Sequence, residues 1–148
     1  MKSTESKNQN QLLIKMIKKN NSLAEKIKSV EDFHNVFLIG NSDSPTLLDE
    51  REFKLRYNLI KEENEEYLDA CKKGDIVEIA DALGDQLYIL FGTILKHGLQ
   101  HKIEEVFDEI HRSNMSKLDA DGQPIFREDG KILKSEFYFK PDLAKLLK

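Results

Sequence analysis

The chain has 148 residues, a length for which one compact domain is expected. Charged side chains make up 34% of it and hydrophobic ones 39%, and 23 Lys and Arg against 27 Asp and Glu give a formal net charge of −4. Seven Gly, three Pro and no Trp argue against a many-turned β-sandwich, and the single Cys71 excludes an internal disulfide and a cysteine-based zinc finger. No apolar run approaches the roughly 18 residues of a membrane span and the polar start is unlike a signal peptide, so we expect a cytoplasmic protein without a membrane partner.

Charge is distributed unevenly along the chain. Residues 47–111 hold sixteen acidic and eight basic side chains, whereas residues 1–30 hold seven Lys and two Glu. Proteins that bind duplex DNA need clustered Lys and Arg without a larger acidic block. Nucleic acid is therefore not an expected partner.

Hydrophobic periodicity and capping signals divide the chain into helices. An amphipathic N-terminal helix and a short second helix lead into a loop of turn-forming residues at 40–45. Asp75 is a predicted N-cap, and Gly74 and Gly98 are predicted helix ends. The predicted helices span residues 8–29, 29–37, 48–72, 75–97 and 100–117, with a last helical turn opened by Pro141.

The C-terminal part has a different character. Two Asp-Gly turn dipeptides begin at Asp121 and Asp129, and residues 125–127 and 131–133 are candidate strands of a short hairpin. No internal repeat, low-complexity tract or long linker is found. We therefore predict an all-α fold, an antiparallel helical bundle with a small C-terminal hairpin appendage.

The predicted helix 75–97 carries an acidic stripe on an otherwise apolar surface. Its apolar residues cover most of the circumference, and no Lys or Arg occurs within residues 74–95. Glu78, Asp81 and Asp85 fall within a stripe of about 60°, taking about 100° per residue. Three like charges on a buried helix repel one another and are costly to desolvate, so a positive group is expected to face them. A capping box is a competing local use for Glu78.

The preceding helix adds carboxylates to this stripe. Glu62 and Glu66 share a face, while Glu63 lies near the azimuth of the apolar positions and is predicted to point inward. A short connection makes the two helices antiparallel neighbours, so six carboxylates are predicted to converge on a site for Mg²⁺ or Mn²⁺. The alternative for residues 62–66 is a solvated charged face. Arg56, on the face of Glu63, is predicted to be a buried ion-pair partner.

These patterns resemble a known family. Glu63-x-x-Glu66 followed by Glu78-x-x-Asp81 resembles the metal-binding signature of the all-α nucleoside triphosphate pyrophosphohydrolases. That superfamily includes MazG, the dimeric dUTPases, the dCTP pyrophosphatases and phosphoribosyl-ATP pyrophosphohydrolase. Further stretches are similar to a MazG-like branch, at residues 30–34, 56–63, 78–85, 111–118, 129–134 and 139–143. Residues 29–148 are thus predicted as a MazG-like domain, and residues 1–28 as an N-terminal helix outside the match.

The resemblance implies metal-dependent hydrolysis of a nucleoside or deoxynucleoside triphosphate between the α- and β-phosphates. The products are a nucleoside monophosphate and pyrophosphate, as in the house-cleaning of nucleotide pools. Mg²⁺ is the implied cofactor, with Mn²⁺ as a substitute, and the implied assembly is a homodimer or homotetramer. The implied metal ligands are Glu63, Glu66, Glu78, Asp81 and, less directly, Asp85. The implied catalytic residues are Glu63 and Glu62, the latter as a ligand or as the base for the attacking water.

The resemblance places nucleotide binding in the basic C-terminal part. Asn114 and Lys117 lie about one helical turn apart, and Asn pairs with base or sugar whereas Lys pairs with phosphate. Lys131 and Lys134 are predicted to close over the phosphates, with surface solubility as the alternative for the lysines. His34 is a candidate wall of a base pocket, with an ordinary core position as the alternative.

Two other functions stay open at this point. One is phosphoribosyl-ATP pyrophosphohydrolase activity, which belongs to the same superfamily. The other is a non-catalytic helical interaction module whose acidic cleft binds a basic partner. A di-iron carboxylate bundle is disfavoured because it needs two Glu-x-x-His pairs, and the two acidic helices contain none.

Overall fold

The computed structural model describes residues 22–148, and residues 1–21 lie outside the described part. The described helices are α2 (Leu23–Val36), α3 (Glu50–Lys73), α4 (Ile76–Lys96), α5 (Ile103–Met115) and α6 (Leu143–Leu146). Within residues 22–148 there is no extended strand, and no helix combines the length and apolar character needed to span a membrane. The predicted all-α bundle is confirmed.

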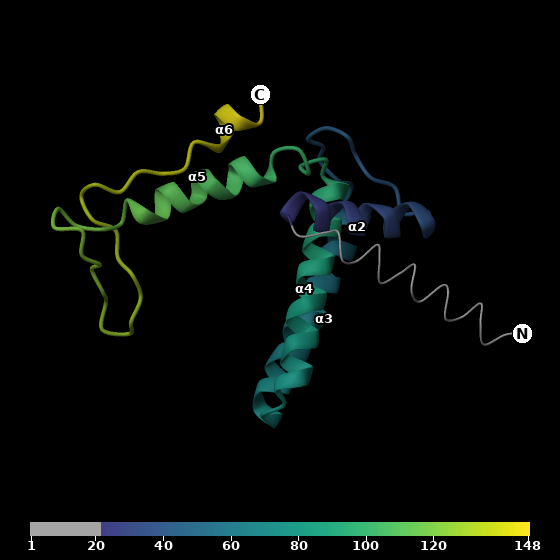
Figure 1. The fold of residues 1–148 in the computed structure, drawn as a ribbon, viewed down its shortest axis with the longest axis horizontal. Coiled ribbons are helices and arrows are strands. Elements are labelled where there is room, and N and C mark those ends of the chain that lie inside the picture. The colour runs from purple at the N-terminus through teal and green to yellow at the C-terminus, as the bar shows by residue number, and fades with distance from the viewer. Residues whose placement is uncertain (1–21) are drawn as a thin grey trace, which may run out of the picture. The chain divides into compact units, whose positions relative to one another are not determined.

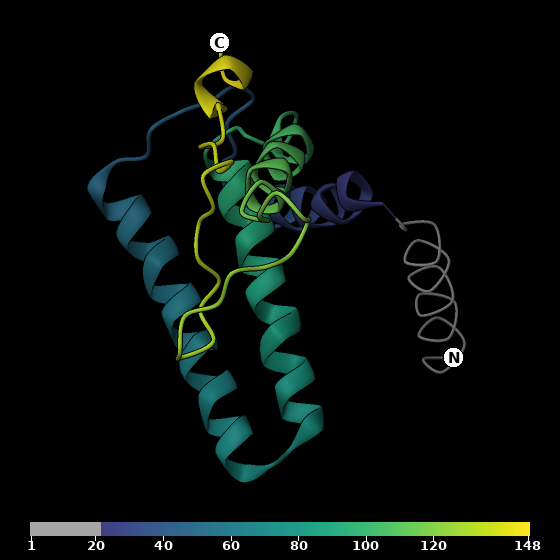
Figure 2. The ribbon, with the colours of Figure 1, turned by 90° about the vertical axis from the view of Figure 1, so that its left-hand side faces the viewer.

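The chain forms two compact units, Met1–Gln100 and His101–Lys148. In the first unit, α3 and α4 pack along each other as an antiparallel hairpin, and α2 packs across the C-terminal half of α4 (Figures 1 and 2). In the second unit, α6 packs on α5. The predicted division between residues 1–28 and 29–148 falls inside α2, and as a domain boundary it stays a prediction.

The start of α2 differs from the sequence prediction. The Ser22 side chain accepts a hydrogen bond from the Glu25 backbone N–H, and the Glu25 carboxylate accepts one from the Ser22 N–H. This capping box starts the helix at Leu23, and the helix then runs without a break past residue 29 to Val36. The prediction of separate helices over 8–29 and 29–37 is therefore wrong for the described residues, and residues 8–21 lie outside them.

Capping residues set the ends of the long hairpin. The side chain of Asp49 accepts from the backbone of α3, and that of Asp75 accepts from the Val77 and Glu78 N–H groups at the start of α4. Gly74 ends α3 with φ 71°, a left-handed conformation that suits glycine. The two-residue connection reverses the chain as predicted. The acidic segments of α3 and α4 consequently lie at the same end of the hairpin.

Arg56 joins the two long helices near the other end. Its Nε donates to Thr93 Oγ1 at 2.9 Å and its Nη2 donates to the Ile89 carbonyl at 2.7 Å. Gly92 makes room for this contact, because a Cβ there would lie 2.7 Å from Arg56 Nη2 and 2.9 Å from His34 Nε2. The prediction that Arg56 forms an ion pair is wrong among the described residues, since α4 offers it a carbonyl and a hydroxyl at this position.

A loop after α2 is held against the C-terminal end of α4. Ser42 N–H donates to the Leu95 carbonyl at 3.0 Å, and Gln100 Nε2 donates to the Ser42 carbonyl at 2.9 Å. Gly98 has φ 68°, and a Cβ there would lie 2.0 Å from the Ser44 carbonyl oxygen. This loop is thus a fixed part of the first unit.

The C-terminal unit consists of α5 with the following tail folded along it. Glu109 accepts two hydrogen bonds from the Arg112 guanidinium, at 2.8 and 2.9 Å, and one from the Asp142 N–H at 2.8 Å. The predicted hairpin is reduced to one isolated antiparallel bridge between Phe126 and Ile132. The turn between them is stabilised by the side chain of Asp129, which accepts from the Lys131 N–H.

Candidate functional site

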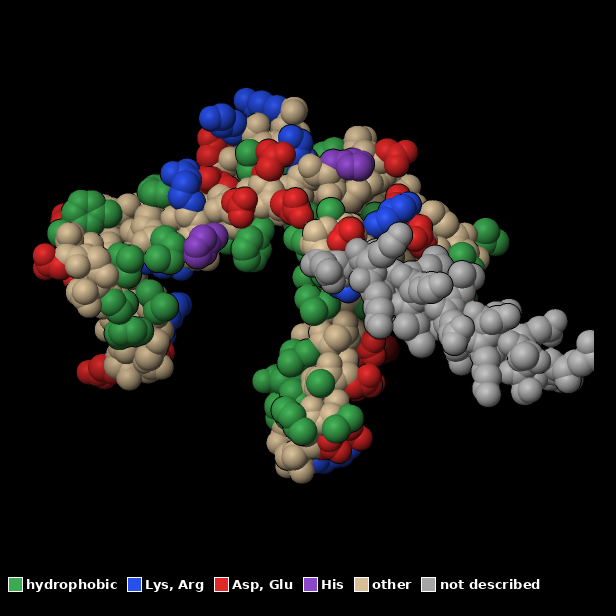
Figure 3. Space-filling model, in the orientation of Figure 1, with side chains coloured by type: hydrophobic (Ala, Val, Ile, Leu, Met, Phe, Trp, Pro, Cys, Tyr) green, Lys and Arg blue, Asp and Glu red, His purple; other side chains and the backbone are tan. Residues whose placement is uncertain are grey.

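Acidic side chains gather on one side of the α3–α4 hairpin, and hydrophobic side chains gather on the other (Figure 3). Glu66 and Asp69 of α3 face Glu78 and Asp81 of α4 across a cavity of about 280 Å³, which Lys73 also lines. The antiparallel pairing predicted from the short connection thus brings carboxylates from both helices together. Asp69, one turn after Glu66, is an additional carboxylate that the sequence analysis did not single out.

Glu63 lies half-buried on α3, as its position near the apolar face predicts. Its Oε2 atom is buried and has no hydrogen-bond partner among residues 22–148. Burial raises the pKa of Glu63, and the carboxylates of Glu66, Asp85 and Asp81 raise it further. A buried carboxylate oxygen without a partner is costly. A bound cation would satisfy this carboxylate oxygen and the neighbouring carboxylates, which no side chain of the described residues does for Glu63 Oε2.

Lys73 brings a positive charge to this site. The sequence had suggested only that Lys73 lies near the end of a helix. Its Nζ lies 3.4 Å from the Glu78 carboxylate, with 65% and 55% of the two side chains exposed. Asp75 caps α4 with its own carboxylate, while the Glu78 side chain contacts Lys73. The five-residue spacing of Lys73 and Glu78 across a Gly-containing turn is the signal that could have found this pair.

The carboxylates are neighbours without forming a finished metal centre. Among the described residues, no three His, Cys, Asp or Glu side chains are placed to hold one metal ion together. Glu62, Glu66, Glu78, Asp81 and Asp85 are all exposed. Exposed side chains of this kind change rotamer on the picosecond to nanosecond scale. The assignment of metal ligands and of Glu62 as a catalytic residue stays a prediction.

His34 is held inside the first unit. It is 3% exposed, and its Nδ1 lies 2.6 Å from Asn41 Oδ1. Burial lowers the pKa of His34 against the opposing effect of the Asn41 hydrogen bond, and the charges of Arg56 and Lys96 lower it further. The structure thus gives His34 a structural environment, and its contact with a substrate stays a prediction.

The other predicted substrate residues belong to the C-terminal unit. Lys117 Nζ donates to Asn114 Oδ1 at 2.8 Å, so these two residues do meet. Lys134 Nζ lies 4.5 Å from the centroid of the Tyr138 ring, and Lys131 is exposed in the turn after the Asp129 cap. A joint role of these residues with the carboxylates of the first unit stays a prediction.

Comparison with known proteins finds one relative by sequence and one matching family. The chain is 32% identical over 84 residues to Uncharacterized protein L479 of Acanthamoeba polyphaga mimivirus. This stretch is 57% of the chain and only 30% of the L479 protein, so the chain spans a minor part of that relative. Residues 30–114, more than half of the chain and including every predicted metal ligand, match the phosphoribosyl-ATP pyrophosphohydrolase family. The chain therefore belongs to the phosphoribosyl-ATP pyrophosphohydrolase family, within the MazG-like all-α nucleoside triphosphate pyrophosphohydrolases.

Proposed function

We propose that this protein hydrolyses a nucleoside triphosphate between the α- and β-phosphates, with Mg²⁺ as cofactor and Mn²⁺ as a substitute. Family membership supports a nucleotide pyrophosphohydrolase in general. The single observation that carries the metal-dependent form is the buried Glu63 Oε2, which has no partner in the described chain and faces further carboxylates. A site of this charge needs a cation before it can accept a polyphosphate.

The residues proposed to hold the cation are Glu63, Glu66, Glu78, Asp81 and Asp85. When bound, a divalent cation would neutralise phosphate oxygens and lower the pKa of the attacking water. Glu62 is exposed beside Glu63, and its carboxylate is the proposed acceptor of the proton that this water loses. Lys73 Nζ lies beside Glu78 and lines the same cavity. It is the proposed contact to a phosphate there.

Phosphoribosyl-ATP is the second candidate substrate. The matched family is described by activity on this compound, whose triphosphate contains the same α–β bond. A third candidate, the non-catalytic acidic module, predicts binding of a basic partner without turnover. Measuring pyrophosphate release from ordinary, deoxy and modified nucleotides and from phosphoribosyl-ATP, with Mg²⁺ and Mn²⁺ compared, separates these three functions.

Two substitutions test the role of the carboxylates. Glu66→Gln and Asp81→Asn keep the shape of each side chain and remove its charge, so we expect turnover at saturating Mg²⁺ to fall by about 100-fold or more. Glu65→Gln is the matched control, because Glu65 is exposed on α3 and lies 3.7 Å from Lys61. Unchanged turnover in both Glu66→Gln and Asp81→Asn would rule out the proposed site.

We also propose that a second copy of the chain covers the apolar side of the hairpin, in a homodimer or homotetramer. Leu83, Leu87 and Leu90 are 44%, 52% and 47% exposed on α4. Together with Ile60 and Gln86 they line an open cavity of about 520 Å³. Contiguous apolar surface of this kind is typical of protein–protein interfaces.

The proposed location is the cytoplasm, where nucleoside triphosphates are abundant. An exposed free thiol, that of Cys71, fits a reducing compartment. The proposed partners are accordingly a nucleotide and a second copy of the chain, and neither a nucleic acid nor a membrane is proposed.

A further inference from the structure

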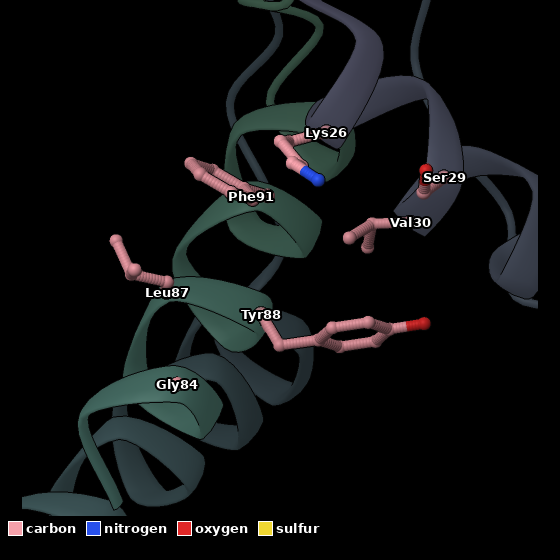
Figure 4. A pocket seen from close by; sticks show the side chains of 7 residues that line it. All are labelled: Lys26, Ser29, Val30, Gly84, Leu87, Tyr88 and Phe91. Atoms are coloured by element: carbon pink, nitrogen blue, oxygen red, sulfur yellow. The ribbon is translucent and has the colours of Figure 1, made fainter. Parts of the chain in front are cut away.

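A cavity of about 230 Å³ lies between α2 and α4, and Gly84 forms part of its lining (Figure 4). The lining is mostly apolar, with Val30 of α2 and with Leu87 and Phe91 of α4 among its residues. Leu87 also belongs to the surface proposed to meet a second copy of the chain, so this cavity adjoins that surface.

The second compact unit carries a different chemistry, in the sequences Asp121-Gly122 and Asp129-Gly130. An aspartate followed by glycine can rearrange its own backbone. The glycine nitrogen attacks the aspartate Cγ, the new N–Cγ bond closes a five-membered succinimide ring, and the carboxyl hydroxyl leaves as water with the amide hydrogen. Glycine favours this step because it has no Cβ beside the attacking nitrogen.

Water then opens the succinimide at either of its two carbonyl carbons. The hydroxyl adds to the carbon, the carbon–nitrogen bond breaks, and the second hydrogen returns to the glycine nitrogen. Opening at Cγ restores aspartate, whereas opening at the former peptide carbonyl leaves a main chain that runs through Cβ and Cγ, which is isoaspartate. One water is lost and one is gained, so the rearrangement needs no oxidant, reductant or cofactor.

The carboxylate of Asp121 is free to take part in this reaction. Asp121 is exposed, and its backbone N–H donates to Asp119 Oδ1 at 2.9 Å. Its side chain has no hydrogen-bond or ion-pair partner within residues 22–148. The Asp121 Cγ can therefore turn toward the nitrogen of Gly122.

The carboxylate of Asp129 is held by its neighbours. Arg127 Nε donates to Asp129 Oδ1 at 2.9 Å, Arg127 Nη2 donates to Oδ2, and the Lys131 N–H donates to Oδ1 at 3.1 Å. These bonds, that of Arg127 first, lower the pKa of Asp129. A carboxylate that is kept ionised and oriented by two guanidinium donors is a poor target for the glycine nitrogen, because its oxygen needs a proton before it can leave as water.

The two glycines are alike, so the carboxylates make the difference between the pairs. Gly122 and Gly130 each donate their N–H to a carbonyl of their own turn, at 3.0 and 2.9 Å. Neither has an atom beyond its chain neighbours within 4 Å of a Cβ position. We propose that Asp121 is a site of spontaneous isoaspartate formation, and that Arg127 protects Asp129 from the same reaction.

Isoaspartate at position 121 would change the turn that follows α5. Asp119 Oδ1 accepts from the N–H groups of both Asp121 and Gln123, at 2.9 and 2.8 Å. The rearranged residue places one more main-chain atom between these two donors, so one acceptor no longer reaches both in this geometry. We expect the amide of Gln123 to exchange its hydrogen faster in the isomerised fraction, as measured by NMR.

Labelling with ¹⁸O measures the reaction at each site without any need for enzymatic activity. Ring opening in H₂¹⁸O leaves one ¹⁸O atom in the residue, and fragmentation mass spectrometry locates it. Peptides of residues 118–127 and 124–134 supply the rate of each Asp-Gly pair outside the fold. Divided by the rate of its peptide, the rate in the folded wild type should be about three- to tenfold higher at Asp121 than at Asp129, a range that allows for the exposure of the Arg127 pair.

Three variants separate the causes. Arg127→Gln removes both guanidinium donors, so labelling of Asp129 should rise toward the peptide rate while labelling of Asp121 stays unchanged. Ile132→Ser is the matched control, because Ile132 is 51% exposed and its bridge to Phe126 holds the hairpin without using the Asp129 side chain, so Asp129 should stay protected. Asp121→Glu should abolish the label at position 121, because glutamate would have to close a larger ring.

The outcomes that contradict the proposal are distinct. No label at Asp121 in the folded protein, while its peptide reacts, would overturn the isoaspartate site. Equal peptide-normalised rates at Asp121 and Asp129 in the wild type would overturn the protection of Asp129. The role of Arg127 fails if Arg127→Gln leaves the labelling of Asp129 unchanged, or if Ile132→Ser raises it as much.

Discussion

Gly92 occupies the point where side chains from α2 and α3 meet the backbone of α4. A methyl group there would lie 2.7 Å from Arg56 Nη2 and 2.9 Å from His34 Nε2, so both side chains would have to move. We expect Gly92→Ala to lower the free energy of unfolding by about 1–3 kcal/mol, in the range of overpacked cores. Urea denaturation measures this change.

Gly84 supplies the control for that prediction, because it is the other glycine within α4 and has free space around its Cα. Gly84→Ala should raise the free energy of unfolding by about 0.5–1 kcal/mol through helix propensity alone. Equal effects of the two substitutions would show that Arg56 and His34 do not require the space at Gly92.

His34 makes stability depend on pH. Its folded-state pKa lies below the ordinary value of 6.5, first because of burial and then because Arg56 of α3 and Lys96 of α4 are positive, although the Asn41 hydrogen bond opposes this shift. As the pH falls below 6.5, His34 therefore binds a proton in the unfolded state before it does so in the folded state. The free energy of unfolding decreases over the interval between pH 6.5 and the lower folded-state pKa. Urea midpoints should fall between pH 7.5 and 5.5 in the wild type.

The variant His34→Gln separates this effect from other titrations. Glutamine does not titrate, so the fall in urea midpoint over the same pH interval should be smaller than in the wild type, whatever the absolute stability of the variant. Glu52, the ion-pair partner of Lys96 at 2.7 Å, is unchanged in both proteins. Identical slopes for the two proteins would assign the pH dependence to other groups.

At the scale of elements, the contact of α6 with α5 depends on the carboxylate of Glu109. Hydrogen bonds from the Arg112 guanidinium and from the Asp142 N–H lower the pKa of Glu109 to about 2. The ionised Glu109 carboxylate therefore stabilises the fold fully at pH values above its ordinary pKa of 4.5. This stabilisation is lost as the pH falls through the folded-state pKa of about 2. We expect Glu109→Gln to speed hydrogen exchange of the Asp142 amide at neutral pH, as measured by NMR.

Glu105→Gln, on the same helix, is the control for this exchange measurement. Glu105 is exposed and lies 3.4 Å from Lys102, so its substitution should leave the Asp142 amide unchanged. Exchange that stays slow in Glu109→Gln would mean that the neutral amide oxygen replaces the carboxylate as acceptor.

The helices could be predicted where local signals determine them. Lys73, Gly74 and Asp75 form a helix end, a left-handed turn and an N-cap in consecutive positions, so the hairpin was readable from the sequence. The start of α2 was missed because the apolar spacing continues through Ser22, while the capping box of Ser22 with Glu25 determines where the helix begins. A cap depends on one side-chain geometry, and a periodic pattern does not report it.

The candidate site could be predicted only in part. Helical geometry placed Glu63 near the apolar side of its helix and Asp81 on the acidic stripe, because azimuth within one helix follows from sequence spacing alone. The contact of Arg56 with the Ile89 carbonyl depends on the register of two packed helices, which no residue pattern reports. The contact of Lys73 with Glu78 depends on how the turn folds back. The cavity beside Gly84 is produced by tertiary packing of α2, so it was likewise out of reach.

For the whole molecule, the exposed apolar side of the hairpin sets the expected assembly. Leu87 is 52% exposed and lines both apolar cavities beside α4. A charge there would have to be buried without a partner at an interface, so Leu87→Glu should weaken self-association by about tenfold or more. Sedimentation velocity over a concentration series measures the effect.

Leu47→Glu is the control, because Leu47 is 94% exposed in the loop before α3. It adds the same charge away from the cavities, and the mass of the assembly should be unchanged. A wild-type chain that sediments as a monomer at every concentration would contradict the proposed assembly.

The bond from the Gln100 side chain to the Ser42 carbonyl has a consequence for cooperativity. Gln100 is the final residue of the first compact unit, and its amide ties that end back to a loop of the same unit. The second unit has its own closing contacts at Glu109 and Asp142. Calorimetry should resolve two heat-absorption peaks if the units melt separately and one peak if they melt together. In the first case a midpoint from one spectroscopic probe would describe only the unit that carries the probe.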